Sequence, residues 1–165
     1  YPLLLTIAAP ISGTLSDKIG SEILTFIGLM LISFGLFLMS TLNTDSNVLI
    51  MLVFIAIMSI GMGLFQSPNN SLIMSKVSKD KLGIAGSVNA LVRNLGMVCG
   101  IALATTLLYT MMSFEIGERV TDYVPGRSDA FIYGMKAVYV TAAVISFIGA
   151  LLTLYRLTRK KANKN

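Results

Sequence analysis

The sequence contains no histidine, no tryptophan, a single cysteine and few charged residues. Without histidine there is no imidazole to act as a general base or as a metal ligand, and we expect no metal site and no cofactor. The lone Cys99 has no partner for an intrachain disulfide. Charged residues make up 13% of the chain, whereas soluble domains carry about 25%. The composition therefore argues against a soluble globular domain.

Long segments of the chain are nearly free of charge; two contain none, one contains only Arg93 and one contains only Lys136. A helix needs about 20 predominantly apolar residues to cross the hydrocarbon core of a bilayer. The expected fold class is an all-α, polytopic transmembrane helix bundle. The predicted spans cover the end of one helix at about 1–12 and complete helices at about 23–42, 48–75, 82–112 and 130–155.

The sequence begins inside an apolar segment, without a methionine or a basic leader, so a signal peptide does not explain residues 1–11. We expect instead the C-terminal part of a longer protein. Lys136 lies about one and a half turns into the last span, and its long side chain is expected to snorkel outward.

The net charge of +5 arises from lysine and arginine residues beside the spans. Because positive charge accumulates in cytoplasmic loops, their distribution predicts a multi-pass protein of the cell membrane with a cytoplasmic C-terminus, its tail at 156–165. Topology explains the basic residues better than a nucleic-acid surface, so no nucleic-acid partner is expected. On the predicted cytoplasmic side lie Lys18, Lys76, Lys79, Lys81 and five basic residues from Arg156 to Lys164; on the other lie Arg119 and Arg127.

Two of the predicted spans carry polar stripes. Positions spaced by four, three and four residues share one helical face. Polar groups at membrane depth usually face the bundle interior or a water-filled cavity, so these stripes predict a solute cavity with Arg93 pointing into the bundle. The substrate-cavity candidates are Ser59, Gly63, Gln66, Asn69 and Asn70 in one span and Asn89 and Arg93 in the next.

Proline and glycine add predictions about helix shape and packing. Pro68 lacks an N–H and its ring clashes with the carbonyl of Leu64, which predicts a kink. Gly96 and Gly100 allow a close helix approach on the Arg93 side, and the seven-residue interval between Gly28 and Gly35 predicts another packing stripe.

A short polar segment, residues 13–22, is expected to form the first loop. Ser21 is a candidate cap for the following helix, and Glu22 complements the positive end of that helix's dipole. All eight acidic residues of the chain are expected in loops, so the sequence shows no acid deep in a span that could pair with Arg93.

Two motifs carry a family resemblance. The pattern Gly13-x-Leu15-x-Asp17-Lys18-x-Gly20 is similar to a cytoplasmic loop signature of the major facilitator superfamily. The stretch from Pro68-Asn69-Asn70 through Arg93-Asn94-x-Gly96 to Gly100 resembles the fourteen-helix drug–proton antiporter branch of that superfamily. The resemblance covers essentially the whole chain, as the last four helices and the end of the preceding one.

The resemblance implies that residues 48–75 and 84–111 line a translocation cavity and that 23–42 and 130–155 are peripheral. It also implies a conformational gate formed by Gly13, Asp17, Lys18 and Gly20; the alternative for Asp17 and Lys18 is a solvated pair of topogenic charges. Arg93 is expected either to contact substrate, to pair with an acid on a helix outside this chain, or to bond backbone carbonyls.

The predicted function is proton-coupled export of hydrophobic or amphipathic compounds by alternating access against a missing N-terminal bundle. The coupling acids are then expected outside this chain. The alternatives are a major facilitator transporter of a defined metabolite or organic anion, with Arg93 as counter-ion, and a small structural or interaction membrane bundle. The absence of a Ser–base constellation or an intramembrane acid argues against an enzyme. The expected partners are the lipid bilayer and a small-molecule substrate.

Overall fold

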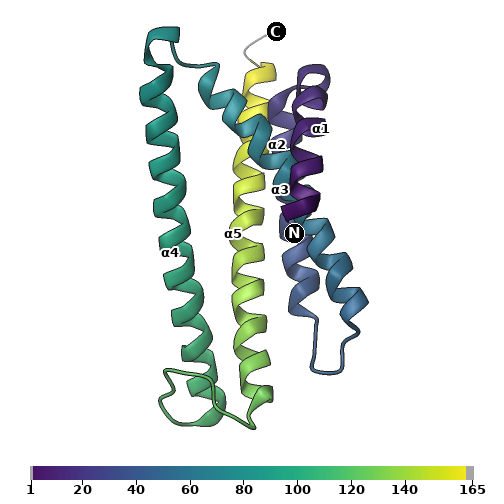
Figure 1. The fold of residues 1–165 in the computed structure, drawn as a ribbon, viewed down its shortest axis with the longest axis vertical. Helices are drawn as coiled ribbons and strands as arrows, with labels where there is room; N and C mark the ends of the chain where they lie inside the picture. The colour runs from purple at the N-terminus through teal and green to yellow at the C-terminus, as the bar shows by residue number, and fades with distance from the viewer. Residues whose placement is uncertain (1, 163–165) are drawn as a thin grey trace.

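Over residues 2–162, which the structure describes, the computed structural model consists of α-helices and one short 3₁₀ turn (Figure 1). Tyr1 of the predicted first span and residues 163–165 of the predicted tail lie outside this range. The elements are α1 (Pro2–Ile19), α2 (Ser21–Ser40), α3 (Val48–Met74), the turn η1 (Lys79–Lys81), α4 (Leu82–Ile116) and α5 (Ser128–Ala162).

The all-α membrane fold predicted from the sequence is confirmed. Within the described residues, α2, α3, α5 and α4 together with η1 are long and apolar enough to cross a membrane. The last span is longer than expected, because α5 continues through the first basic residues of the predicted tail, Arg156 and Arg159. At 1.5 Å per residue, α5 is roughly 52 Å long, so it extends beyond a hydrocarbon core of about 30 Å.

The expected loop at residues 13–22 is wrong, because this segment is almost entirely helical. α1 continues to Ile19 and α2 begins at Ser21, so Gly20 alone separates them. The Ser21 hydroxyl does not cap α2; it lies 2.7 Å from the Ser16 hydroxyl, across the junction. Glu22 lies in the first turn of α2, as predicted. The polar residues expected in a loop therefore form the last turns of α1 and the first turn of α2, joined by the Ser16–Ser21 hydrogen bond.

The junction between α1 and α2 depends on the backbone freedom of Gly20. Its φ of 95° and ψ of 136° lie close to a region that essentially only glycine occupies. We expect Gly20→Ala to lower the free energy of unfolding by about 1–3 kcal/mol, measured by thermal melting of the purified transporter. Gly83→Ala is a suitable control, because Gly83 has a negative φ and a Cβ added there would have no neighbouring atom within 4 Å. Equal melting of the two variants would contradict this account.

α2 forms the centre of the bundle, packed against α3 on one side and α5 on another. A third of its apolar span is buried (33%), against 6% for the span of α4. A Cβ on Gly28 would lie 2.7 Å from the carbonyl oxygen of Gly61, and a Cβ on Gly35 would lie 2.5 Å from a side-chain carbon of Met58. The predicted packing stripe of Gly28 and Gly35 is therefore confirmed, with α3 as its partner.

Serine hydroxyls join helices inside the bundle. The Ser12 hydroxyl of α1 lies 2.9 Å from the carbonyl oxygen of Gly63 in α3 and is fully buried. The Ser33 hydroxyl of α2 donates to the carbonyl oxygen of Ala143 in α5 at 2.8 Å. Such bonds contribute about 0.6 kcal/mol each in membrane proteins. They fix the positions of α1 and α5 relative to the central pair.

Candidate solute pathway

The polar stripes of α3 and α4 meet at one hydrogen bond. The Asn89 side-chain amide donates to the side-chain oxygen of Asn70 at 2.9 Å, and both residues are half-buried. The short connection through η1 turns the chain back, so α4 runs antiparallel to α3. Periodicity placed these asparagines on the polar faces of separate spans, and the structure brings those faces together at this point.

The remaining candidates on α3 fall into two groups. Gln66 and Asn69 are half-buried and lie within one turn of Asn70. Ser59 is fully buried and donates to the carbonyl oxygen of Ile55 in its own helix at 2.7 Å. A Cβ on Gly63 would lie 2.5 Å from the side chain of Ala8 in α1. In this conformation Ser59 and Gly63 contribute to packing, and neither is open to a solute.

Arg93 lies on a face of α4 that no described helix covers. Its side chain is exposed, and it has no hydrogen-bond or ion-pair partner among residues 2–162. No atom lies within 4 Å of a Cβ built on Gly96 or Gly100. The expected insertion of Arg93 into the bundle and the close approach at these glycines therefore do not occur within the described chain.

The reason is that α4 contacts α3 only around Asn89 and packs against α5 near its own C-terminal end. There a Cβ on Gly134 of α5 would lie 2.7 Å from the carbonyl oxygen of Leu108, and Met112 is fully buried. Along its preceding turns α4 stands to one side of the other helices (Figure 1). The polar face from Asn89 to Arg93 is thus left open, beside the half-buried amides of α3.

The gate candidates lie in the C-terminal half of α1 and at its junction with α2. Asp17 and Lys18 are exposed and form no ion pair with a described residue. Gly13 lies inside α1, where a Cβ would sit 3.6 Å from the Ser67 hydroxyl of α3. Next to Ser67, Pro68 is buried within α3, which continues helically through it. The latch role and the kink remain predictions.

Sequence reasoning missed the burial of Glu22. This residue is 9% exposed at the start of α2, and Asp17, Glu115 and Asp129 also lie within terminal helical turns rather than in loops. The dipole argument identified the position of Glu22 in the helix, but its burial results from tertiary packing that no local pattern reports. Within the described residues, no three His, Cys, Asp or Glu side chains group as metal ligands would.

The geometry of a membrane bundle with one open polar face agrees with the comparison to known families. Residues 1–165 match the family model of the Major Facilitator Superfamily. The chain belongs to this superfamily. It is accordingly a multi-pass membrane protein, in a superfamily of transporters rather than of enzymes.

Several members of the superfamily resemble this chain. It is 30% identical over 155 residues to the riboflavin transporter RibZ of Clostridioides difficile, covering 94% of this chain and 33% of that protein. It is 28% identical over 137 residues to the multidrug transporter protein MdtP of Bacillus subtilis, covering 79% and 25%. A triacylglyceride transporter of Mycolicibacterium smegmatis is 27% identical over 190 residues, with 93% and 32% covered.

The chain thus spans between a quarter and a third of the length of these curated relatives. No solved structure matches it. The substrates named for these relatives differ widely, so the comparisons do not identify a substrate.

The Asn70–Asn89 bond predicts energetic coupling between α3 and α4. We expect Asn70→Ala and Asn89→Ala each to lower the free energy of unfolding. The loss in the double variant should be smaller than the sum of the two single losses by about 0.6 kcal/mol, and by about 1.7 kcal/mol at most. Thermal unfolding in detergent of all four proteins measures this coupling. Ser87→Ala is the control partner, because the Ser87 hydroxyl bonds only the Gly83 carbonyl of its own helix. Strict additivity of the two asparagine variants would show that the bond is not formed.

Proposed function

We propose that this chain is the C-terminal part of a proton-coupled exporter of hydrophobic or amphipathic compounds. The observation that supports this most is the open polar face of α3 and α4, joined at Asn70 and Asn89. A polar face at membrane depth needs either a facing helix bundle or an aqueous cavity. Alternating access supplies both, with this bundle rocking against an N-terminal one.

In this proposal Gln66, Asn69, Asn70, Asn89 and Arg93 face the cavity. Amide side chains both donate and accept hydrogen bonds, so they suit chemically varied solutes. Resemblance to a multidrug transporter favours such a broad substrate range. α2 and α5 would then be peripheral to the cavity, as the family resemblance implies.

Proton coupling requires a titratable group in the membrane. The acidic residues of the described chain lie in connections or in terminal helical turns. We therefore place the coupling carboxylates on helices outside this chain, where one of them would also pair with Arg93.

The orientation proposed is the one that lysine and arginine predict, with the α1–α2 junction, the η1 turn and the end of α5 in the cytoplasm. Asp17 and Lys18 are then exposed at the cytoplasmic surface, where they would engage the N-terminal bundle in one conformation. If Asp17 meets the N-terminus of a helix in that bundle, the contact would contribute only about 0.3–1 kcal/mol, which suits a latch that must also open.

The test uses the full-length transporter in everted membrane vesicles that carry a pH gradient reported by a quenched acridine dye. Addition of a lipophilic cation such as ethidium should dissipate the gradient and drive uptake into the vesicles. Vesicles lacking the transporter provide the baseline. Ethidium transport that persists unchanged after the gradient is collapsed with nigericin would contradict proton coupling.

A second candidate is a transporter of one defined metabolite, and the 30% identity to a riboflavin transporter favours it. The same vesicles separate the candidates. Saturable riboflavin transport without any response to ethidium would identify the metabolite transporter, whereas ethidium transport that riboflavin does not inhibit would support the exporter.

A further inference from the structure

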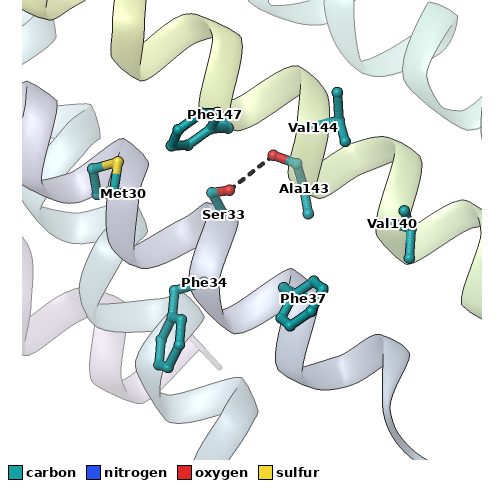
Figure 2. A pocket seen from close by; sticks show the side chains of 8 residues that line it. All are labelled: Met30, Ser33, Phe34, Phe37, Val140, Ala143, Val144 and Phe147. Carbon is teal, nitrogen blue, oxygen red and sulfur yellow. Dashed lines mark hydrogen bonds between the residues drawn. The ribbon is translucent and has the colours of Figure 1, made fainter.

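An apolar groove of about 350 Å³ lies between α2 and α5, away from the polar face of α3 and α4. Figure 2 shows that its walls come from facing turns of these two helices, with the Ser33–Ala143 hydrogen bond between them. Because that bond satisfies the Ser33 hydroxyl, the lining offers no free donor. The lining residues are Met30, Ser33, Phe34, Phe37, Val140, Ala143, Val144 and Phe147.

A cation lies at one end of this groove. Lys136 precedes Val140 by one helical turn of α5, so both residues lie on the same face. The Lys136 ammonium donates to the side-chain oxygen of Asn43, just beyond the end of α2. This bond carries the lysine side chain from α5 to the connection that follows α2, at the end of the α2–α5 contact that forms the groove.

The ammonium retains hydrogen-bonding capacity for an anion. A lysine ammonium has three donors, and Asn43 uses one of them. No carboxylate of the described residues lies within 4 Å of Lys136. The positive charge at the mouth of an apolar groove is therefore not neutralised by a described acid.

The spacing of the cation and the groove matches one bilayer leaflet. From Lys136 to Phe147, α5 rises roughly 16 Å at 1.5 Å per residue, and half of a hydrocarbon core of about 30 Å is nearly the same length. From Lys136 to Arg156 the rise is roughly 30 Å, the full thickness of the core. Lys136 thus lies at headgroup level when Arg156 lies at the opposite interface.

We infer that this groove is a specific phospholipid site, with the lipid phosphate on Lys136 and one acyl chain lying along the α2–α5 seam. Charge complementarity at Lys136 and the leaflet-length apolar lining both favour a phospholipid of the surrounding bilayer. A wholly apolar occupant would leave the ammonium without an anion, and a hydrophilic one would not fill a groove lined with Phe34, Phe37 and Phe147. The site is separate from the solute pathway.

The test uses the full-length transporter in phosphatidylcholine nanodiscs that contain phosphatidylglycerol with a diazirine on one acyl chain. After illumination, mass spectrometry maps the labelled peptides. We expect label in α2 and α5 around Phe34 and Val144. Lys136→Gln should reduce it roughly fivefold, since one lysine near a membrane surface contributes about that factor, and Lys136→Arg should preserve it.

A matched pair of tryptophan variants tests the groove itself. Val140→Trp places a large side chain in the groove and should remove most of the label, whereas Ile145→Trp adds the same bulk at an exposed position of α5 that does not line it. Size-exclusion profiles identify any variant that fails to fold, and Lys136→Gln leaves the packed helix faces unchanged.

Unchanged labelling in both Lys136→Gln and Val140→Trp would overturn the proposal. Absence of label from α2 and α5 in the unsubstituted protein, as when another helix or a second copy covers the seam, would also overturn it.

Discussion

Replacing Gly28 with valine should clearly lower the yield and the melting temperature of the folded transporter. A Cβ at this position would lie 2.7 Å from both the carbonyl oxygen of Gly61 and the amide nitrogen of Phe65. Both contacts are backbone atoms of α3, which cannot move aside as a flexible side chain does. Because Gly61 makes the reciprocal approach, with its Cβ position 2.9 Å from the carbonyl oxygen of Gly28, the two helices would have to separate.

Overpacking of this kind typically costs about 1–3 kcal/mol, and the β-branched valine adds further bulk close to the backbone. Since proteins are stable by only about 5–15 kcal/mol, the yield of monodisperse protein and the melting temperature should both fall clearly. Size-exclusion chromatography of a fluorescent fusion measures the yield, and a thermal ramp measures melting.

The matched control is Gly149→Val in α5. This glycine lies in the same bundle, but its Cβ position is 3.8 Å from the nearest atom, the end of the Leu29 side chain. The two variants share the same change in helix propensity and differ in the packing contact. If Gly28→Val melted like Gly149→Val, the α2–α3 contact would not be the tight joint that the structure describes.

The helical core of this chain could be predicted from the sequence because its determinants are local. Apolar length identified the spans, and the repeat of 3.6 residues placed Asn70 and Asn89 on the polar faces of their helices. Small residues spaced by a full heptad predicted the packing face of α2. Each of these signals depends on helix geometry alone, which does not change with tertiary context.

The α1–α2 junction could not be predicted in the same way. Its polar residues resemble a loop by composition, yet α1 stays helical through them because the buried Ser12 bonds Gly63 of α3 and Gly13 packs against Ser67. These contacts join segments about fifty residues apart. The burial of Glu22 and the turn of Lys136 toward Asn43 have the same origin, since each depends on which helix lies alongside.

Neither the local sequence pattern nor the fold of this chain shows what surrounds Arg93. Its lack of a partner within the part of the chain that the structure describes predicts a large loss of transport when the arginine is removed. An arginine at membrane depth costs roughly 2.5–3.5 kcal/mol on insertion scales, so it needs a partner. Arg93 has none among the described residues, so under the proposed function its partner is an acid on a helix of the N-terminal bundle or the substrate.

Arg93→Ala should therefore lower the initial transport rate of the full-length transporter by roughly a hundredfold or more, because removing one member of a buried charge pair costs about 3–5 kcal/mol. Arg93→Lys should retain part of the activity, since it keeps the charge but loses the planar fork of the guanidinium. Arg119→Ala changes an arginine in the connection after α4 and should transport normally. Rates are measured in vesicles and normalised to the amount of folded transporter.

The substrate dependence of this variant separates the two possible partners. If Arg93 pairs with an acid on another helix, Arg93→Ala should abolish the transport of anionic and neutral compounds alike, and replacing that acid with its amide should restore part of it. If Arg93 is the counter-ion of an anionic substrate, neutral dyes should still be transported. Wild-type rates for both classes would show that transport does not need Arg93, and that the open face of α4 is not the solute pathway.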